Sequence, residues 1–389
     1  MAIESRPEQR EPRIRLGMVG GGTGAFIGAV HRIAARLDDR YELIAGALSS
    51  TPERARQSAT ELGLDEDRSY DDFRQMAIRE ARLKQGIEAV AIVTPNHMHY
   101  PVAREFLKRG IHVICDKPLT ATLKDAKKLQ AVVEKNDALF VLTHNYSGYP
   151  MVRQAREMVR AGEIGDVRLV QVEYVQDWLT EPLEQTGQKQ AAWRTDPEQS
   201  GAGGSTGDIG SHAHHLAEFV SGRAVTELSA DVDAFVEGRK LDDNAHVMLR
   251  FERGAKGTLW CSQVAPGHEN GLRLRIYGAR GGLQWAQEDP NYLLFSPLGQ
   301  EPRRITRGGA GAGEAAGRVT RIPPGHPEGY LEGFANIYSE AADAIVAARS
   351  GQNINADALL QTVADGVRGV AFVEACITSS RRNGAWVKF

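Results

Sequence analysis

Short, continuously apolar runs alternate with amphipathic stretches through the first part of the chain. The apolar runs cover residues 14–20, 42–48, 89–94, 112–115 and 139–143, and the amphipathic stretches cover residues 27–37, 52–62, 71–83, 100–109 and 122–135. Strands buried on both faces of a parallel sheet have this continuous apolar character. The alternation therefore predicts a doubly wound α/β domain. A further helix is expected over residues 151–160, between Pro150 and Gly162.

Apolar and polar residues alternate one by one in the second half. This pattern covers residues 167–178, 225–237, 243–252, 255–264 and 272–285. It predicts a sheet with one packed face and one face that is solvated or pairs with a partner, and the short turns favour antiparallel connections. Long Gly/Pro-rich connections are expected at 181–207 and 299–328, with a flexible segment at 307–318. Helices are expected over 329–349 and 356–382.

A glycine-rich loop, GGGTGAFIG at residues 20–28, joins the first predicted strand to the first predicted helix. Glycines let the backbone approach a pyrophosphate, and the helix N-terminus attracts its negative charge. Gly20, Gly22 and Ala25 fit G-x-G-x-x-G/A, and Gly28 would let the helix pack closely if the loop carries an insertion. A βα turn without a ligand is the alternative. We expect a dinucleotide site.

The second predicted strand ends at Leu48-Ser49-Ser50-Thr51, where NAD-selective domains usually carry Asp or Glu. The serine hydroxyls can bond a ribose 2′-OH, and nothing there repels a 2′-phosphate. Arg54 can reach such a phosphate, or it is simply a solvated residue. NAD is the expected cofactor, with NADP as the open alternative.

Composition narrows the possible functions. Lys and Arg number 47 and Asp and Glu 50 among 389 residues, a net charge of −3, which argues against a nucleic-acid-binding surface. No apolar stretch approaches about 18 residues, so no membrane span is expected. The polar N-terminus has no apolar signal region, which predicts a cytoplasmic location. Cys115, Cys261 and Cys376 have no metal-binding or disulfide spacing, so reduced thiols are expected.

Three further groups carry candidate chemistry. Residues 94–99 (TPNHMH) and 116–118 (DKP) directly follow predicted strands, where ligands bind in such folds. In the third group, a helix starting near Asp208 places Asp208 and His212 one turn apart, with His215 on the same face. A histidine near a helix N-terminus favours its neutral form, which a general base needs.

Each of these groups also has a structural interpretation. Lys117 can be a surface lysine before a proline-started helix, and Asp208 can cap its helix. The histidines can be polar residues packed under a loop. No metal is expected, because no further set of ligands with suitable spacing is evident.

Two segments, TPNHMHYPVAREFLKRGIHVICDKPLT (94–120) and AAWRTDPEQSGAGGSTGDIGSHAHHLAEFVSG (191–222), resemble the signatures of the Gfo/Idh/MocA family, named after glucose–fructose oxidoreductase, inositol dehydrogenase and a rhizopine-catabolism protein. The resemblance implies an N-terminal Rossmann domain and a C-terminal α+β domain with a large, mostly antiparallel sheet that often builds dimers or tetramers. We expect a tail at 1–12, a Rossmann domain at 13–145 and the second domain at 146–389, whose terminal helices can pack back on the first.

The resemblance also implies an NAD(P)-dependent oxidoreductase that acts on a hydroxyl or keto carbon of a sugar, anhydrosugar or cyclic polyol. Its implied catalytic set is Lys117, Asp208 and His212, with His212 as base, Lys117 stabilising the alkoxide and Asp208 orienting them. Asp116 replaces the family's Glu. Ser147 stands where relatives often carry an arginine, and His215 where many carry an acid.

The expected cofactor-binding residues lie in the glycine loop and after the following strands: Gly20, Gly22, Thr23, Ala25, Phe26, Ile27, Ser49, Ser50, Arg54, Thr94, Pro95, Asn96, His99, Asp116 and Lys117. The expected substrate-binding residues are Lys117, His144, Tyr146, Asp177, Trp193, Arg194, Asp208, His212, His215, Arg321 and His326, with Arg318 as a further candidate. Solvated or packed roles remain open for those in the long connections.

Two other functions compete with a dehydrogenase. An NAD-dependent redox glycosidase would oxidise a sugar hydroxyl transiently and release the aglycone by elimination. A cofactor-binding regulator would have no catalysis, which the intact Lys117, Asp208 and His212 argue against. In every case we expect a small carbohydrate or polyol partner, no nucleic acid and no membrane, and a homodimer or homotetramer formed through the C-terminal sheet.

Overall fold

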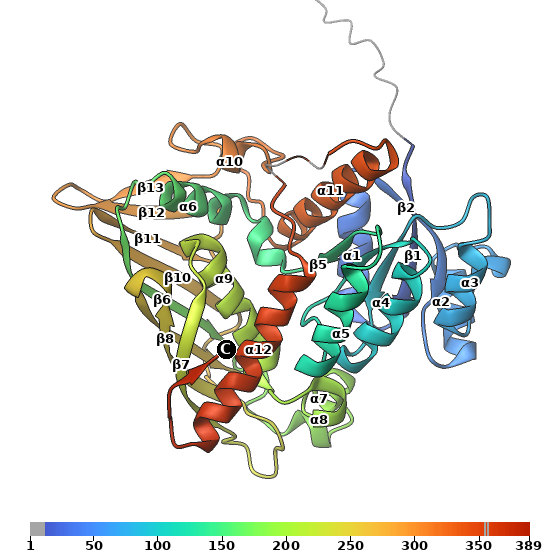
Figure 1. Ribbon diagram of the computed structural model, residues 1–389, viewed down its shortest axis with the longest axis horizontal. Helices are drawn as coiled ribbons and strands as arrows, with labels where there is room; N and C mark the ends of the chain where they lie inside the picture. The colour runs from blue at the N-terminus through green and yellow to red at the C-terminus, as the bar shows by residue number, and fades with distance from the viewer. Residues whose placement is uncertain (1–11, 354, 356–357) are drawn as a thin grey trace, which may run out of the picture.

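The computed structural model describes residues 12–389 except residues 354, 356 and 357, and its strands form two sheets (Figure 1). The expected tail lies outside the described residues, apart from residue 12. The first sheet is parallel, in the order β2-β1-β3-β4-β5, which confirms the doubly wound prediction. Its strands are β1 (Ile14–Gly20), β2 (Tyr41–Ala47), β3 (Ala89–Val93), β4 (His112–Cys115) and β5 (Phe140–Leu142).

Helices cover both faces of the parallel sheet. Successive strand residues point to opposite faces, so Ala91 packs toward α1 and α11 while Val90 and Ile92 pack toward α3, α4 and α5. This is why the strands read as unbroken apolar runs. The helices of this lobe are α1 (Phe26–Leu37), α2 (Pro52–Glu61), α3 (Phe73–Glu80), α4 (His99–Leu107), α5 (Leu123–Val133) and, from the chain's end, α11 (Tyr330–Arg349).

The second sheet has nine strands in the order β13-β12-β11-β10-β6-β9-β8-β7-β14. It is antiparallel except where β6 pairs with β9. Its strands are β6 (Val167–Val175), β7 (Val225–Asp233), β8 (Asn244–Phe251), β9 (Lys256–Ser262), β10 (Gly271–Gly278), β11 (Gly281–Ala286), β12 (Tyr292–Pro297), β13 (Arg303–Thr306) and β14 (Val387–Lys388).

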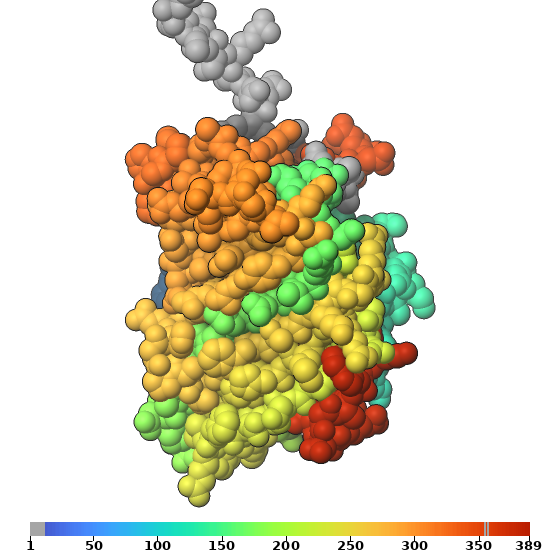
Figure 2. Space-filling view, turned by 90° about the vertical axis from the view of Figure 1, so that its left-hand side faces the viewer, coloured from blue at the N-terminus to red at the C-terminus, as the bar shows by residue number. Residues whose placement is uncertain are grey.

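Only one face of the second sheet is packed. Its inner face carries α6 (Pro150–Arg160), α9 (Ser211–Ser221) and α12 (Val363–Arg381), whose apolar residues share a core with the inward residues of the strands. The outer face forms the surface seen in Figure 2, where the strands run across the molecule without a described helix above them. The one-by-one alternation of the sequence reflects this asymmetry.

The last two long helices tie the lobes together. On α11, the Tyr338 hydroxyl lies 2.7 Å from Nδ1 of His31 in α1. Helix α12 contributes Val370 to the core of the parallel sheet and Phe372 to the core of the second sheet. The C-terminal helices therefore pack against both lobes.

Several sequence expectations for the second lobe were wrong in detail. The single strand expected over 272–285 is a hairpin of β10 and β11. Its turn at residues 279–280 is flanked by Gly278 and Gly281, a turn signal that the alternating pattern alone does not take into account. Strands β12 and β13 were not expected. The helix expected over 356–382 is α12, which begins at Val363, and residues 356 and 357 lie outside the described residues.

The segment 307–318, which was expected to be flexible, is anchored at a few residues, and most of its other residues are exposed. Arg307 is 2% exposed, and its guanidinium lies 2.9 Å from the buried carboxylate of Glu328. The N–H of Gly313 donates to Oε1 of Gln154, and residues 314–317 form α10 (Glu314–Gly317). The low-complexity composition of this segment gave no indication that Arg307 is buried and anchors it. The other long connection holds α7 (Lys189–Arg194) and α8 (Pro197–Ser200).

The described part of the chain contains no helix that combines the length and apolar character needed to cross a bilayer. Nor do the described residues gather three or more His, Cys, Asp or Glu side chains in an arrangement that could hold a metal ion. The three cysteines are buried free thiols.

Candidate active site

The loops that build the site leave one edge of the parallel sheet. The glycine loop follows β1, Thr94 follows β3, Lys117 is the second residue after β4, and His144 is the second residue after β5. The carboxyl ends of parallel strands all lie at the same edge, which is where ligands bind in open α/β sheets. The topology thus gathers four separate segments of the first lobe.

The glycine loop depends on side chains that are absent. Gly20, Gly21 and Gly24 have φ values of 78°, 70° and 80°, which side-chain-bearing residues rarely adopt. A Cβ on Gly28 would lie 2.3 Å from the carbonyl oxygen of Gly21, so α1 packs directly on the loop at this glycine. Gly28 rather than Ala25 therefore takes the helix-packing position, and the loop carries the insertion.

The start of α1 suits an anion. The helix begins at Phe26, after Ala25, with no side-chain cap and no acidic residue in its first turn. Its first backbone N–H groups, including that of Ile27, belong to the positive end of the helix dipole. Phe26 itself is 66% exposed beside this helix end. The loop therefore fits the pyrophosphate of a dinucleotide.

Thr23 and the end of β2 complete this region. The Thr23 N–H donates to Ser58 Oγ and its hydroxyl donates to Glu61, so this side chain ties the loop to α2. Ser49 Oγ accepts the N–H of Thr51. Ser50 and Arg54 are exposed, and Arg54 has no ion-pair partner among the described residues.

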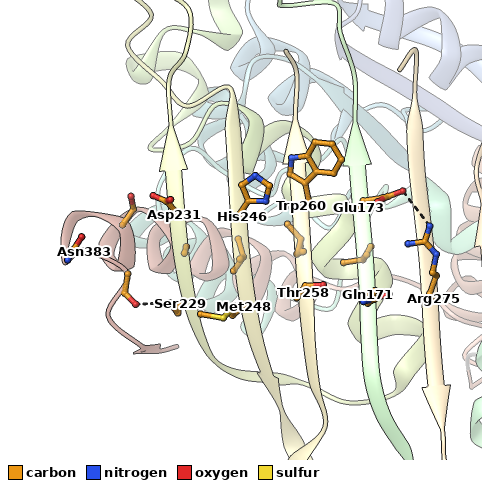
Figure 3. Close-up of a pocket in the computed structure, with 16 residues that line it drawn as sticks. Gln171, Glu173, Ser229, Asp231, His246, Met248, Thr258, Trp260, Arg275 and Asn383 are labelled. Carbon is orange, nitrogen blue, oxygen red and sulfur yellow. Dashed lines mark hydrogen bonds and ion pairs between the residues drawn. The ribbon is translucent and has the colours of Figure 1, made fainter. Parts of the chain in front are cut away.

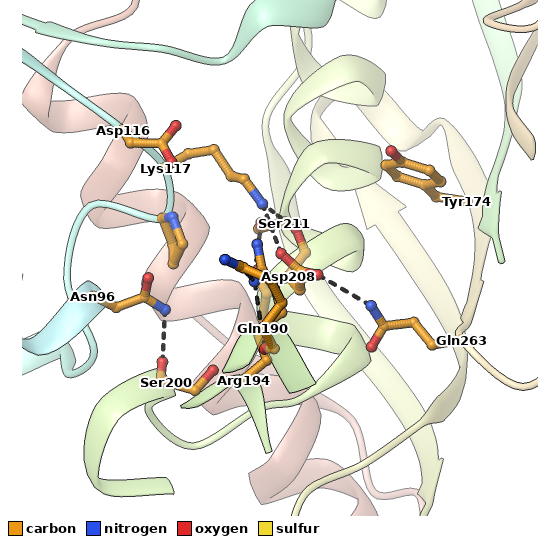
Figure 4. Close-up of polar contacts among 12 residues, drawn as sticks. Asn96, Asp116, Lys117, Tyr174, Gln190, Arg194, Ser200, Asp208, Ser211 and Gln263 are labelled. Atoms are coloured by element: carbon orange, nitrogen blue, oxygen red, sulfur yellow. Dashed lines mark hydrogen bonds and ion pairs between the residues drawn. The ribbon is translucent and has the colours of Figure 1, made fainter. Parts of the chain in front are cut away.

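The segment after β3 holds the lobes together. The Thr94 hydroxyl is buried without a hydrogen-bond partner among the described residues. After Pro95, the Asn96 amide donates to the carbonyl of Ser200 in α8, a bond between the lobes (Figure 4). His99 is fully buried, with one ring nitrogen 2.8 Å from the Thr94 carbonyl and the other 2.8 Å from the Pro118 carbonyl. Its ring thus connects two loops and presents no nitrogen to a ligand, which corrects the expectation that it binds cofactor.

Asp116 anchors the loop that carries Lys117. Its carboxylate accepts the Thr143 hydroxyl at 3.1 Å and lies 3.6 Å from Nε2 of His31. Burial alone would raise the pKa of this carboxyl, but the His31 ring and the Lys117 charge outweigh burial and lower the pKa to about 2. Asp116, which is shorter than the family's Glu, therefore stays ionised and holds the loop that carries Lys117.

Lys117 and Asp208 meet across the two lobes (Figure 4). The Lys117 ammonium donates to the Asp208 backbone carbonyl at 2.7 Å and to its Oδ1 at 2.9 Å. The two side chains are only 14% and 17% exposed. An ammonium has three donors. One N–H of Lys117 therefore remains for a ligand.

Asp208 is fully engaged by donors. Its second oxygen, Oδ2, accepts the Gln263 amide at 3.0 Å and lies 3.3 Å from Nε of Arg194. Burial opposes ionisation of this carboxyl, but the Lys117 and Arg194 charges hold its pKa well below the ordinary value. Asp208 sits in a π-helical turn, Thr206–Gly210, directly before α9 and does not cap that helix. It is an anchor for cations rather than a proton acceptor.

His212 is the exception in this polar cluster, because none of the described residues hydrogen-bonds to its ring. The ring lies edge-to-face with Tyr146 at a centroid distance of 4.8 Å and tilted toward Tyr174 at 6.1 Å. Burial, and then the Lys117 charge, lower its pKa well below the ordinary value. A neutral imidazole with free nitrogens can accept a proton.

Two more histidines form the floor behind His212. The rings of His144 and His215 stack with centroids 4.0 Å apart, and Nε2 of His215 lies 2.7 Å from Oε1 of Gln361. Burial lowers the pKa of both rings. His144 also lies edge-to-face with His212 at 5.7 Å. His215 is thus held by the chain's C-terminal part, whereas His144 borders the candidate base.

Other expected substrate contacts are engaged elsewhere. The Arg321 guanidinium pairs with Asp38 after α1 and with Asn336 in α11, so it braces the lobes and is not a substrate residue. Arg318 pairs with Glu340 at 3.1 Å. His326 is exposed, with its backbone carbonyl bonded to Arg307. Asp177 accepts the N–H of Gly267 at 3.2 Å.

The second signature brings Trp193 and Arg194 to the cluster. The Arg194 guanidinium lies 4.3 Å from the Trp193 ring centroid, and its Nε faces Asp208. Both residues belong to α7, in a connection that was expected to be loop.

Sequence reasoning missed a wall of uncharged side chains beside Asp208. The Tyr174 hydroxyl lies 2.6 Å from that of Tyr146 and donates to Asn270 Oδ1 at 2.8 Å. Gln176 donates to the same Asn270 oxygen at 2.8 Å, and Gln263 reaches Asp208. Tyr174 is the last residue but one of β6, Gln176 and Gln263 directly follow β6 and β9, and Asn270 directly precedes β10. Their position at strand ends was the available signal, but only the fold shows that those ends face Lys117.

Comparison with known families matches both lobes. A sequence model described as an oxidoreductase family with an NAD-binding Rossmann fold matches residues 14–144. A second, described as a GFO/IDH/MocA C-terminal domain, matches residues 152–284.

Individual relatives match almost the whole chain. A crystal structure of an oxidoreductase from Sinorhizobium meliloti is 64% identical, with a TM-score of 0.89 over 97% of this chain and 100% of that one. An inositol dehydrogenase homologue from Azotobacter vinelandii, complexed with NADH and myo-inositol, is 36% identical, with a TM-score of 0.90 over 97% and 98%. Levoglucosan dehydrogenase from Pseudarthrobacter phenanthrenivorans is 26% identical over 96% of this chain and 97% of its own.

Proposed function

The chain belongs to the Gfo/Idh/MocA oxidoreductase family, and we propose that it is an NAD-dependent dehydrogenase that oxidises a secondary hydroxyl of a neutral cyclic polyol or sugar, with inositols as the first candidates. The observation that carries this proposal is the Lys117–Asp208 ion pair beside the ring of His212, to which no described residue hydrogen-bonds. The inositol dehydrogenase homologue that was solved with NADH and myo-inositol supports the choice of substrate class.

Lys117 would bind the oxygen that reacts. Its ammonium is held by two acceptors of Asp208 and has one N–H left for a substrate hydroxyl. A fixed positive charge in a site with little water stabilises the alkoxide that develops during oxidation. Asp208 keeps the ammonium aimed, because its own oxygens are occupied by Lys117, Gln263 and Arg194.

His212 would take the hydroxyl proton. Its ring is neutral because burial and Lys117 lower its pKa, and its nitrogens have no partner among the described residues. After the reaction the imidazolium would return the proton to solvent as the ketone leaves. Asp208 is a poor alternative base, because its carboxylate is bonded to cations on both oxygens.

The first lobe would hold the cofactor. The backbone of Gly20, Gly22 and residues 24–27 would bind the pyrophosphate, and Ser49 and Ser50 would face the adenosine ribose. When bound, NAD supplies the hydride acceptor. Arg54 is free to meet a 2′-phosphate, so the chain would also bind NADP, with lower affinity than NAD.

The uncharged wall favours a neutral polyol. Tyr146, Tyr174, Gln176, Gln263 and Asn270 offer hydroxyl and amide groups to a ring of hydroxyls. The positive charges beside them, Lys117 and Arg194, are both paired with Asp208. The ionised carboxylate of Asp116 beside Lys117 supplies a second negative charge, so these four groups together carry no net charge that would attract an acidic sugar.

The test is a substrate panel read by net NADH formation. The purified protein is incubated with inositol isomers, hexoses, levoglucosan and glycosides that carry an aglycone, each with NAD and with NADP, and absorbance at the reduced nicotinamide band is followed. The proposal expects stoichiometric NADH with at least one neutral ring polyol or sugar. Release of an aglycone from glycosides without net NADH would replace it with the redox glycosidase. No turnover with any compound would contradict both.

We also propose that two copies associate through the outer face of the second sheet. A hollow of about 560 Å³ lies on this face (Figure 3). Its lining includes Glu173 and Arg275 of neighbouring strands and Met248, which is 52% exposed. Opposite charges and exposed apolar side chains on one flat face suit a self-complementary contact. Light scattering of Met248→Lys would show a smaller assembly than the parent; an unchanged mass would remove this face from the interface.

A further inference from the structure

A second cavity in the C-terminal lobe is lined by arginines. Its volume is about 600 Å³, and it lies where α6 and α9, which pack side by side on the inner face of the sheet (Figure 1), both end. Five arginines line it, whereas Asp166 is the only acid among its lining residues. The arginines are Arg156 and Arg160 of α6, Arg223 after α9, Arg253 between β8 and β9, and Arg280 between β10 and β11.

The charge of this arginine cavity is not balanced by carboxylates. Among the described residues, only Arg160 of the five has a carboxylate within ion-pair distance, Glu157 at 2.7 Å. Buried arginines elsewhere in the molecule are matched: Arg153 by Glu340 and Arg307 by Glu328. Because Arg160, Arg253 and Arg280 are exposed, solvent screens part of the repulsion between these guanidinium groups, and a bound anion would relieve the rest.

Two of the arginines are already fixed in place. One guanidinium N–H of Arg156 donates to the Phe219 carbonyl, and its planar group lies 4.5 Å from the Phe219 ring centroid. Arg280 donates to the carbonyl of Gly162. These bonds satisfy carbonyls at the ends of α9 and α6 and leave further N–H groups on both side chains. Burial, and then the charge of Arg153, lower the pKa of Arg156.

We propose that the arginine cavity binds a phosphate-bearing small molecule. The planar fork of arginine donates two parallel hydrogen bonds to a tetrahedral oxyanion, and several forks converge here from four segments of the chain. The cavity is larger than one phosphate, so the ligand is a phosphate ester with an organic body rather than the inorganic ion alone. This site is separate from the glycine loop, which lies in the other lobe.

Binding would brace the site described above. Helix α6 begins next to the segment that carries His144 and Tyr146, and α9 begins next to Asp208 and carries His212. A ligand that joins the far ends of both helices stabilises the folded state by mass action. The melting temperature is therefore expected to rise with ligand concentration.

Isothermal titration calorimetry of the NAD-saturated protein tests this site, because NAD occupies the glycine loop. The probes are inorganic phosphate and glucose 6-phosphate, and the test variant is Arg223→Gln/Arg253→Gln. The control, Arg303→Gln/Arg304→Gln, removes two arginines that face aromatic rings of β12 and have no carboxylate partner among the described residues. Both double variants lower the net charge equally.

We expect saturable binding by the parent, tighter for the ester, and a loss of at least about tenfold in affinity in the test variant but less than about twofold in the control. Inorganic phosphate binding as tightly as the ester would contradict the ester assignment. The absence of saturable heat in the parent would contradict the site itself. Equal weakening in both variants would also contradict it, because the loss of affinity would then follow from net charge alone.

Discussion

The glycine loop and the Lys117 cluster differ in how the chain forms them. The loop is contiguous, belongs to one lobe, and works because side chains are missing at Gly20, Gly21 and Gly28. The cluster joins charged side chains that are 91 residues apart and belong to different lobes. The first therefore depends on local backbone geometry and the second on how the lobes dock. Damage to either should leave the function of the other measurable.

Polar bonds between the lobes add to the apolar packing of α12 against both cores. Asn96 donates to the carbonyl of Ser200, and the backbone N–H of Leu123 donates to Glu374 in α12. Arg321 bridges Asp38 and Asn336. These contacts are independent of any ligand, so the Lys117–Asp208 distance is set before substrate arrives.

The largest expected effect comes from the base. His212→Ala should lower turnover by roughly 10²–10⁴-fold, because general-base catalysis supplies about that factor. Binding of NAD, followed by fluorescence titration, should stay within about twofold because the loop is untouched. His246→Ala on the outer face is the matched control and should keep full activity. Turnover near that of the parent in His212→Ala would remove this residue as base.

A substitution in the glycine loop should have the opposite result, a loss of cofactor affinity without a loss of turnover. Gly28→Ala places a Cβ 2.3 Å from the Gly21 carbonyl oxygen, and overpacking of this kind costs about 1–3 kcal/mol. The affinity for NAD should therefore fall by roughly 10–100-fold while turnover at saturating NAD changes little. Gly369→Ala, where a Cβ meets nothing within 4 Å, is the control. Equal NAD affinity in both variants would show that the loop does not contact the cofactor as proposed.

Acid should lower the free energy of unfolding through the buried histidines near Lys117. His144, His212 and His215 have folded-state pKa values below the ordinary 6.5, so the unfolded chain binds more protons as the pH falls below that value. Each contributes a loss of about 1.4 kcal/mol per pH unit in that window until its folded-state pKa is reached. Carboxylates with lowered pKa values, such as Asp208, reduce the stability of the fold only when the pH falls below about 4. Urea unfolding at steps from pH 7.5 to 5 should show this decline, and His215→Gln should reduce its slope. A stability independent of pH in this range would contradict the buried, neutral assignment.

The smallest effect is expected at Arg321. Arg321→Ala should leave the KM for substrate unchanged, because its guanidinium is held by Asp38 and Asn336 away from the cluster. It should lower the free energy of unfolding by about 1 kcal/mol, since both partly exposed charges are screened by solvent. Steady-state kinetics beside urea unfolding measure both. A raised KM with unchanged stability would restore Arg321 to the substrate site.

These contrasts also explain what the sequence could predict. The parallel sheet could be predicted because strands buried on both faces form continuous apolar runs. The glycine loop could be predicted because its residues are close together in the sequence. Gln263 and Tyr174 were missed because their relevance depends on which strand ends of the second sheet meet Lys117. Arg321 was misjudged because nothing in its neighbours indicates Asp38, which is 283 residues away. His99 was misassigned because a motif gives the position of a residue but not the direction of its ring.

A double-mutant cycle between the lobes tests the central claim most directly. Lys117→Met and His212→Ala are made singly and together, and kcat for polyol oxidation is measured at saturating NAD. If both groups act on one hydroxyl, the double variant should be about as slow as the slower single variant, because groups that act as a unit are not additive. Independent losses that multiply in the double variant would contradict a shared reaction centre.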